Sequence, residues 1–461
     1  MELDKISRVH LIGIGGIGVS AVAKMMKLMG KEVTGSDVYP GEITKELEKM
    51  GVKVFHGHYF DNVSDDVELV IYSSAVPEDN PERQKAKELN AIELTYFEFL
   101  GEYSRDKFTV AIAGTHGKST TTAMLGKIMV DAGMDPTVIV GSKLDSFSHG
   151  NLQMGKSKYF VVEACEFQAN FLHLNSNILV ITNIEAEHLD YFKNMEGVAE
   201  AFQGLVGKLP KDGILIYNSD DPVSVEQLHP FVTTINYSLN QEATFEARDI
   251  RVTPGKQVFN IIKDGEEYVS DAVLRTPGRF NIYNALAAIS AADELGVEKN
   301  KIKESLNNFG GLWRRLEVVG EYKGATIISD YGHHPTEIIG SIQAVRDFYP
   351  DQRIVWVFQP HHHSRTKQLF NDFIKSFGGV DVLLVSDIYD VAGRELKKDM
   401  DINAKILSDK IAETSPNIEV VYAGDLKETK FKLDEVVREN DVVVFQGAGT
   451  IDEVPRSLIK I

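Results

Sequence analysis

The stretch that decides the fold of this chain is Gly114-Thr115-His116-Gly117-Lys118-Ser119-Thr120. It follows an apolar run at residues 108–113 and precedes a helical pattern at residues 121–132. A strand, a glycine-rich turn and a helix form a phosphate cradle, because backbone N–H groups and the helix N-terminus face the anion. Lys118 adds a positive charge and the Ser119 hydroxyl can hold Mg²⁺, so the stretch predicts binding of a nucleoside triphosphate. The alternative is a Gly-Lys-Ser-Thr sequence in a solvated turn that binds no ligand.

Length and composition indicate a folded protein of two or three domains. The chain has 461 residues, of which 43% are hydrophobic and 25% are charged, and its formal net charge is −19. This acidic balance argues against a nucleic-acid-binding surface. Cys165 is the single cysteine, so no intrachain disulfide can form and a reducing cytoplasm is expected. No apolar run is long enough to predict a membrane-spanning helix.

A second glycine-rich turn lies near the start of the chain, at Gly13-Ile14-Gly15-Gly16-Ile17-Gly18. We expect a strand at residues 8–12 before it, a helix at 19–29 after it, and a second strand from residue 31 that ends near Asp37. An acidic residue about 20 positions beyond the glycines is typical of a dinucleotide-binding βαβ unit. The ligand could be NAD or FAD, or another diphosphate such as that of a UDP-sugar. A turn without ligand is the third possibility.

The middle of the chain continues the alternation of strands and polar turns. We expect a buried strand at residues 159–162 that ends in Glu163, and another at 178–181 that leads into a polar run containing His188. A carboxylate at the end of a neighbouring strand is a common ligand for nucleotide-bound Mg²⁺. Ser119, Glu163 and His188 could share one ion, but imidazole is unusual on magnesium, so a structural histidine stays open. Residues 240–275 suggest a small antiparallel insertion.

Four predicted strands in the last third of the chain each end in polar or glycine residues, so this part also offers a ligand-facing edge. Two histidine groups lie there, at residues 333–334 and 361–363. Zinc binding is one interpretation, but consecutive residues on a strand point in opposite directions and rarely share one metal. Recognition of an anionic substrate group, with Arg365 nearby, is the favoured interpretation.

Three further sets of residues, of which the first lies at the junction of the second and third segments of the chain, have two interpretations each. Arg314 and Arg315 are either a solvated pair or a phosphate clamp. Asn281 is either a helix cap or, like Asn284, a side chain that recognises a base. Cys165 is either a small buried residue or a reactive thiol beside Glu163. In the second case alkylation would inactivate the protein and Mg·ATP would protect it.

Taken in order along the chain, these motifs resemble those of one family, the Mur ligases, ATP-dependent amide-forming enzymes of peptidoglycan synthesis. The resemblance covers essentially the whole chain. Besides the two glycine-rich turns, it rests on Glu163-Ala164-Cys165-Glu166, Thr182-Asn183-Ile184, His188-Leu189-Asp190-Tyr191, Asn281 with Asn284, Arg314-Arg315, Asp330-Tyr331-Gly332-His333-His334-Pro335-Thr336-Glu337 and Phe358-Gln359-Pro360-His361.

The resemblance implies an α/β fold with three domains. These are a Rossmann-like, UDP-sugar-binding domain at residues 1–103, a central P-loop ATPase-type domain with a mostly parallel sheet at 104–316, and a Rossmann-like, amino-acid-binding domain at 317–461. The implied reaction joins L-alanine to the lactyl carboxylate of UDP-N-acetylmuramate through an acyl phosphate, with ATP and Mg²⁺. A cytoplasmic monomer or weak homodimer is implied, without nucleic-acid binding or membrane insertion.

The resemblance also assigns roles to individual residues. Catalytic roles are implied for Lys118, Glu163, His188 and Arg315, and metal binding for Ser119, Glu163 and His188. ATP contacts are implied for Gly114, Thr115, His116, Gly117, Lys118, Ser119, Thr120, Asn281, Asn284, Arg315 and Asp330. UDP-sugar contacts are implied for Gly15, Gly16, Ile17, Gly18, Asp37, Ser73, Ser74, His149 and Asn151. Amino-acid contacts are implied for Tyr331, His361, His362 and Arg365.

Two departures from the family pattern bear on function. Ser119 stands where the family usually has threonine, which keeps the hydroxyl. His362 stands where it usually has an arginine, and an imidazole anchors a carboxylate less firmly than a bidentate guanidinium. The choice among alanine, glycine and serine therefore stays open. The alternatives are a recycling ligase that adds an intact tripeptide to the same sugar nucleotide, and a catalytically inactive nucleotide-sugar-binding protein.

Overall fold

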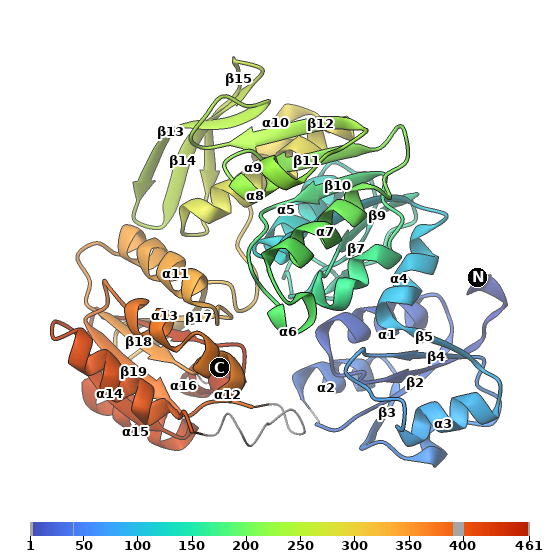
Figure 1. Ribbon diagram of the computed structural model, residues 1–461, viewed down its shortest axis with the longest axis horizontal. Helices are drawn as coiled ribbons and strands as arrows, with labels where there is room; N and C mark the ends of the chain where they lie inside the picture. The colour runs from blue at the N-terminus through green and yellow to red at the C-terminus, as the bar shows by residue number, and fades with distance from the viewer. Residues whose placement is uncertain (1–2, 40, 391–400, 460–461) are drawn as a thin grey trace. The chain divides into compact units, whose positions relative to one another are not determined.

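The computed structural model describes residues 3–39, 41–390 and 401–459. The chain divides into two compact units. The first comprises residues 1–249, 259–272 and 282–307, and the second comprises residues 250–258, 273–281 and 308–461. Both units are built from strands and helices in alternation, as Figure 1 shows, so the expected α/β class is confirmed.

The N-terminal sheet consists of five parallel strands in the order β3-β2-β1-β4-β5. The chain leaves β1 for one side of the sheet and later returns to the other side with β4. Such a switch point is where open α/β sheets bind ligands. The elements are η1 Leu3–Lys5, β1 Arg8–Ile12, α1 Ile17–Leu28, β2 Glu32–Asp37, α2 Glu42–Lys49, β3 Lys53–His56, η2 Phe60–Asn62, β4 Leu69–Tyr72, α3 Pro81–Glu88, β5 Ile92–Thr95 and α4 Tyr96–Ser104.

The central sheet has ten strands in the order β15-β14-β13-β12-β11-β10-β6-β9-β7-β8. Its pairs from β12 to β7 are parallel, and β8 is antiparallel to β7. The strands are β6 Phe108–Ala113, β7 Thr137–Ile139, β8 Leu152–Gln153, β9 Tyr159–Glu163, β10 Ile178–Ile181, β11 Ile214–Asn218, β12 Thr233–Ser238, β13 Phe245–Thr253, β14 Lys256–Lys263 and β15 Glu266–Leu274. The helices are α5 Lys118–Asp131, η3 Phe167–His173, α6 Leu189–Phe192, α7 Met195–Val206, α8 Pro222–Gln227, α9 Arg279–Glu294 and α10 Lys299–Asn307.

The C-terminal sheet has six strands in the order β16-β17-β21-β18-β19-β20, all parallel except β16. Side chains alternate between its faces: Trp356 and Phe358 join one buried cluster, and Val355 and Val357 join the other. The elements are β16 Glu317–Tyr322, β17 Ala325–Asp330, α11 Pro335–Phe348, β18 Ile354–Phe358, α12 His363–Gln368, α13 Phe370–Lys375, β19 Val382–Ser386, α14 Ala404–Thr414, β20 Glu419–Gly424, α15 Leu426–Val436, β21 Val442–Gln446, η5 Thr450–Asp452 and α16 Glu453–Leu458.

Three helices begin earlier than the apolar periodicity predicts. Helix α1 begins at Ile17 rather than at residue 19, and α5 begins at Lys118 rather than at residue 121. Helix α9 begins at Arg279, whereas the apolar pattern predicts a helix from residue 285 to residue 295. The first turns of these helices carry glycine and polar residues next to the proposed ligand sites. A pattern based on burial does not detect them.

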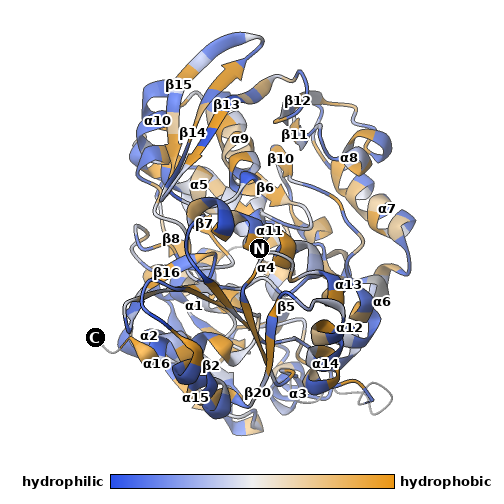
Figure 2. Cartoon of the chain, turned by 90° about the vertical axis from the view of Figure 1, so that its left-hand side faces the viewer, coloured by the Kyte–Doolittle hydropathy of each residue, from blue (hydrophilic) through white to orange (hydrophobic). Residues whose placement is uncertain are grey.

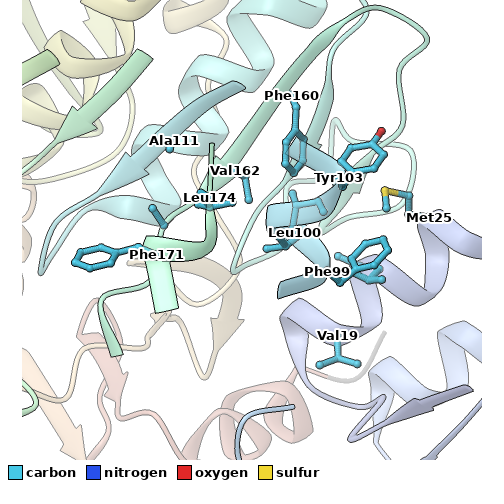
Figure 3. Close-up of a cluster of buried hydrophobic side chains, with 14 of the residues drawn as sticks. Val19, Met25, Phe99, Leu100, Tyr103, Ala111, Phe160, Val162, Phe171 and Leu174 are labelled. Carbon is cyan, nitrogen blue, oxygen red and sulfur yellow. The ribbon is translucent and has the colours of Figure 1, made fainter. Parts of the chain in front are cut away.

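One apolar core joins the N-terminal and central sheets within the first unit. Figure 3 shows Phe99, Leu100 and Tyr103 of α4 beside Phe160 of β9, and the rings of Tyr103 and Phe160 pack edge to face with centroids 5.0 Å apart. Helix α4 approaches η3 so closely that a Cβ at Gly101 would lie 2.5 Å from the His173 carbonyl oxygen. In Figure 2 most strands are hydrophobic along their length, whereas α10 is largely hydrophilic.

Candidate functional site

The phosphate turn connects β6 to α5 through two glycines with positive φ angles. Gly114 has φ 132° and Gly117, which caps α5, has φ 86°. A Cβ at Gly114 would overlap the Thr182 hydroxyl, and one at Gly117 would overlap the Asn284 side chain. The turn therefore requires glycine at both positions for conformation and for space. Lys118, Ser119 and Thr120 occupy the first turn of α5.

The polar residues after β10 hold this turn in place. The Thr182 hydroxyl donates to the His116 carbonyl oxygen at 2.6 Å, and the Asn183 amide donates to the same oxygen at 3.1 Å. In return, Asn183 accepts from the His116 N–H at 2.9 Å, and the Glu185 N–H donates to the Thr115 hydroxyl at 2.8 Å. The polar run predicted at the ligand-facing edge thus supports the turn from behind.

Lys118 is held by a carboxylate that the sequence analysis did not select. Its ammonium lies 2.9 Å from the Glu166 carboxylate and donates to the carbonyl oxygens of Gly114 and Thr115 at 2.5 and 2.9 Å. Burial opposes the charge on Lys118, but Glu166 outweighs it, and the pKa of Lys118 is raised. The Glu166 side chain is 4% exposed, so this is a buried ion pair.

Ser119 and Glu163 meet directly, as the sequence analysis expects. The Ser119 hydroxyl donates to Glu163 Oε2 at 3.1 Å. The other oxygen of Glu163 accepts from the N–H of Gly141, in the loop after β7. A hydroxyl and a carboxylate in contact offer the hard oxygen ligands that Mg²⁺ prefers.

His188, expected to share a metal ion with Ser119 and Glu163, lies in a group with Glu166 and Glu187. Its Nε2 is 3.8 Å from a Glu166 oxygen, and its ring packs edge to face on Phe167. Among the described residues, Glu166, Glu187 and His188 form the group whose ligand atoms lie within reach of one ion. The sequence patterns did not point to Glu166 or Glu187 as metal ligands. Glu187 directly precedes His188, and Glu166 lies three positions after Glu163.

The two asparagines expected at the adenine have different partners. Asn284 lies against the phosphate turn, with Oδ1 3.3 Å from the Thr121 hydroxyl. Asn281 donates from Nδ2 to the Pro277 carbonyl oxygen at 2.7 Å. Because α9 begins at Arg279, Asn281 lies inside the first helical turn, and its interpretation as the cap is wrong.

The glycine loop of the N-terminal sheet has a carboxylate on one of its N–H groups. Asp37 Oδ2 accepts from the Gly15 N–H at 2.8 Å, and Oδ1 accepts from the Tyr39 N–H at 3.0 Å. Gly16 caps α1, and a Cβ at Gly18 would lie 2.8 Å from the Tyr96 ring. Ser73 and Ser74 follow β4, with the Ser73 N–H donating to the Ile12 carbonyl oxygen at 3.1 Å.

Asn151, expected at the sugar, is fully buried behind the glycine loop. Its Nδ2 donates to the Ile17 carbonyl oxygen at 2.6 Å and to the Ser20 hydroxyl at 2.9 Å, and its Oδ1 accepts from Lys24 at 2.8 Å. His149 is half-buried, and burial together with the charge of Lys24 lowers its pKa. The structure brings Asn151 to the helix that follows the loop rather than to an open surface.

In the second unit, the Asp330 side chain bonds to three segments of the chain, one of them directly after the arginine pair. Its oxygens accept from the Leu316 N–H at 3.2 Å, the Ser341 hydroxyl at 2.9 Å and the Gln446 amide at 2.7 Å. The side chain of Arg314 donates to the carbonyl oxygens of two glycines, at 447 and 449, and its pKa is lowered by burial.

The aromatic ring of Tyr331 lies beside both arginines of the pair. The guanidinium carbons of Arg314 and Arg315 are 5.0 and 5.2 Å from the Tyr331 ring centroid. Cations at this distance from an aromatic ring are attracted to its face. Tyr331 therefore helps to hold the pair in place.

Three of the four residues expected at the amino acid lie in one aromatic and histidine group. His333 packs edge to face on Tyr331 and lies 5.9 Å from the His361 ring, which stacks on Tyr389. Burial, reinforced by His362 and other nearby cations, lowers the pKa of His361 to about 3, so this imidazole is neutral near pH 7. Arg365 lies one helical turn away in α12.

Asp390 is a further residue of this group that the sequence analysis did not select. His362, at φ 64°, places Nδ1 3.2 Å from Asp390 Oδ1, and the Nδ1 atom of His363 bonds to the other oxygen. Despite its burial, the bonds to the two imidazoles lower the pKa of Asp390. Two consecutive histidines therefore share a carboxylate here, which is the contact that the zinc interpretation did not anticipate.

The thiol of Cys165 lies between the two glutamates of the phosphate site. Burial, reinforced by the charge of Glu166, raises its pKa to about 12. The thiol therefore stays protonated near neutral pH, and reaction with an alkylating reagent is expected to be slow. Inactivation by alkylation stays a prediction.

A phosphate turn on a mostly parallel sheet, joined to a Rossmann-like sheet with a glycine loop and to a third α/β sheet, defines a modular protein of the nucleotide-binding class. Three family models match this arrangement. They are described as "Mur ligase family, catalytic domain" at residues 8–108, "Mur ligase middle domain" at 112–292 and "Mur ligase, glutamate ligase domain" at 314–449. The chain belongs to the Mur ligase family.

Individual relatives extend over the full chain. The UDP-N-acetylmuramate–L-alanine ligase of Aquifex aeolicus is 40% identical over 463 residues, covering 100% of this chain and 99% of that protein. The enzyme of the same name from Caldanaerobacter subterraneus subsp. tengcongensis is 39% identical with the same coverage. The crystal structure of UDP-N-acetylmuramate–alanine ligase from Thermotoga maritima has a TM-score of 0.84, with 29% identity and 98% of each chain covered. None of the helices in the described ranges is long and apolar enough to span a bilayer.

Proposed function

We propose that this chain joins L-alanine to the lactyl carboxylate of UDP-N-acetylmuramate, with hydrolysis of ATP to ADP and phosphate, in the synthesis of peptidoglycan precursors. The observation that carries the proposal is the match, from end to end, to ligases of that name at 39–40% identity. The intact phosphate turn, with Lys118 and the Ser119–Glu163 pair, supports catalysis rather than binding alone.

The first step activates the carboxylate. An oxygen of the lactyl carboxylate attacks the γ-phosphorus of ATP, the bond to the β,γ-bridging oxygen breaks, and ADP leaves. Activation is needed because a carboxylate would otherwise have to expel oxide. Lys118 is placed to exchange Glu166 and the turn carbonyls for phosphate oxygens, and the N–H groups at the start of α5 add to that charge.

Magnesium fits the donor atoms at this site. When bound, Mg²⁺ neutralises charge on the phosphate oxygens. Ser119 and Glu163 would hold it with oxygen atoms, and His188 would hold it beside Glu166 and Glu187, which also offer hard oxygen ligands.

The second step forms the amide. The nitrogen of L-alanine attacks the acyl carbon, the bond from that carbon to the phosphate oxygen breaks, and phosphate leaves while the nitrogen loses a proton. We propose that Arg365 binds the alanine carboxylate, with the histidine and tyrosine group beside it. Neutral His361 can accept a hydrogen bond from the amine, because burial keeps its imidazole unprotonated. Arg315 and Asp330 are proposed to contact phosphate and ribose.

The remaining assignments are also proposals. Residues 1–103, 104–316 and 317–461 are the proposed UDP-sugar, ATP and amino-acid domains. Because ATP and nucleotide sugars are cytoplasmic metabolites, we propose that the chain acts in the cytoplasm. A monomer or weak homodimer is proposed, and light scattering across a range of concentrations tests it.

The test is phosphate release from ATP with UDP-N-acetylmuramate present, measured with no acceptor, L-alanine, glycine, L-serine or the free tripeptide. Release that depends on L-alanine is expected. Release with the tripeptide alone would make the chain a recycling ligase, and no release with any acceptor would leave a protein that binds nucleotide sugars without catalysis.

A further inference from the structure

A buried lysine lies between the N-terminal sheet and the loop that follows β7. The side chain of Lys24, in α1, is 3% exposed. Its ammonium donates to Glu46 at 3.0 Å, to the His149 carbonyl oxygen at 3.0 Å and to Asn151 Oδ1 at 2.8 Å. All three protons of the ammonium therefore have acceptors, which is the condition under which a lysine can be buried.

Lys24 determines which way the Asn151 carboxamide points. A lysine ammonium only donates, so the oxygen of Asn151 must face it and the NH₂ group must face away. The NH₂ group then reaches the Ile17 carbonyl oxygen and the Ser20 hydroxyl in the first turn of α1. A flipped carboxamide would place its oxygen against the Ile17 carbonyl oxygen and lose that bond. It could keep a bond to Ser20 only if the Ser20 hydroxyl stopped donating to Ile17.

The first turn of α1 is the end of the glycine loop. Gly16 caps this helix, so the N–H groups of residues 17–19 in its first turn have no partners within the helix and can face an anion. The N–H groups of residues 13–16 are bonded within the protein, that of Gly15 to Asp37. No cationic side chain lies in the loop itself, residues 13–18, so anion binding there depends on how the backbone is aimed. Asn151 contacts that first turn at the Ile17 carbonyl oxygen and the Ser20 hydroxyl.

The loop that carries Asn151 is closed on itself and reaches the phosphate site of the central sheet. The Val140 N–H donates to the Asn151 carbonyl oxygen at 3.0 Å, and the Leu144 N–H donates to the Gly150 carbonyl oxygen at 3.1 Å. Next to its first residue, the Gly141 N–H bonds to Glu163. A rigid loop thus contacts the helix of the glycine loop at one end and a proposed metal ligand at the other.

We propose that Lys24 and Asn151 are positioning residues for diphosphate binding: Lys24 orients the Asn151 carboxamide, and the carboxamide aims the first turn of α1 at the diphosphate of the sugar nucleotide. The inference rests on the proposed function only for the identity of that nucleotide. Asn151 acts here through the glycine loop and does not touch the sugar, which replaces the role that the resemblance gave it.

Two substitutions test the proposal without changing the volume of the site much. Lys24→Met removes the charge that orients the carboxamide. Asn151→Asp keeps the size and the contact to Lys24 but removes the donors to Ile17 and Ser20. The matched control is Lys143→Met, because Lys143 bonds to the same Glu46 at 2.7 Å but is not a partner of Asn151.

The measurements are the dissociation constant of UDP by calorimetry, the KM of all three substrates, kcat and Tm. We expect both variants to raise the Kd of UDP and the KM of UDP-N-acetylmuramate about tenfold, a change of the size expected for the loss of one hydrogen bond. The KM values of ATP and L-alanine should stay within about twofold of wild type, as should every constant of the control.

Three results would overturn the inference. The first is a Kd of UDP that Lys24→Met and Asn151→Asp leave unchanged. The second is an equal effect on all three substrates with a lowered Tm, which would mean a packing role. The third is the same loss in Lys143→Met, which would assign the effect to Glu46. Because UDP binding needs no turnover, it tests this inference even if the wild-type protein forms no product, and that result would count against the proposed function alone.

Discussion

The two glycine turns of the first unit occupy the same position, between a strand and a helix, and differ in their chemistry. Each follows a parallel strand and caps a helix, at Gly117 before α5 and at Gly16 before α1. The central turn carries Lys118, whose charge is balanced by Glu166. The N-terminal turn has no cation, and its Gly15 N–H is bonded to Asp37. The central turn therefore carries a positive charge of its own, whereas the N-terminal turn offers an anion backbone N–H groups alone.

The side chains that bond to the backbone of each turn also come from different places. Thr182 and Asn183 hold the central turn through its own carbonyl oxygens, from the neighbouring strand of the same sheet. Asn151 holds the N-terminal turn from another sheet, and a buried lysine orients it. Under the proposed role of Asn151, the N-terminal turn is held in place only when the central sheet is packed against it, so the two sheets would act together.

Loss of the cation should have the largest effect. Lys118→Met is expected to lower kcat at least about a hundredfold, because no other side chain of the turn carries positive charge to the developing phosphate. Lys127→Met, in the same helix and paired with Asp131 at 2.6 Å, is the control. Steady-state kinetics with a UDP titration checks both. If Lys118→Met kept more than a tenth of wild-type kcat, the two turns would not differ as we describe.

Substitution of Glu166 should weaken Mg²⁺ binding at the central turn and leave UDP binding at the N-terminal turn unchanged. In Glu166→Gln the charge beside Lys118 and His188 is lost, so we expect the Mg²⁺ concentration for half-maximal activity to rise about tenfold while the Kd of UDP is unchanged. Glu200→Gln, on an exposed position of α7, is the control. Magnesium dependence equal to wild type would mean that Glu166 has no part in the metal site.

The cap glycines should differ in their tolerance of a methyl group. In Gly117→Ala the new methyl group is strained at φ 86° and meets Asn284. We therefore expect a lower Tm and a free energy of unfolding that is smaller by about 1–2 kcal/mol or more. At Gly16 the φ angle is −68°, and an added Cβ would lie 3.4 Å from the Gly13 carbonyl oxygen. Gly16→Ala should therefore lower the free energy of unfolding by about 0.5 kcal/mol or less. Thermal unfolding of both variants measures the difference, and equal losses would contradict it.

Much of the fold could be predicted because strand ends and glycine turns are local features of the sequence. The strands expected at residues 8–12 and 178–181 are found at Arg8–Ile12 and Ile178–Ile181. The contact of Ser119 with Glu163 also followed, because carboxyl ends of neighbouring parallel strands meet at one edge. Such inferences need only the order of strands in a single sheet.

The residues that sequence reasoning missed act across distances that no local pattern encodes. A lysine in a helix such as α1 is expected at the surface, but Lys24 is buried. Its partner Asn151 is 127 residues away in the sequence, so no local pattern connects the two. Asp390 meets His362 only because the segments after β18 and β19 pair at residues 361 and 389. Helix starts were misplaced for a related reason, since first-turn residues serve ligands and loops rather than the core.

The smallest expected effect is on the pH dependence of Tm, through His149 next to the N-terminal turn. Burial and the charge of Lys24 lower the pKa of His149 below its value in the unfolded chain, so the unfolded state binds more protons as pH falls through that value. Stability contributed by the neutral imidazole is therefore present above the unfolded pKa and is lost as pH falls toward the folded one. Wild-type Tm should drop slightly more than that of His149→Gln between pH 7.5 and 5.5. Lys24→Met should reduce this drop, because one of the two causes is removed. Identical drops in all three proteins would show that protonation of His149 does not change the stability of the fold.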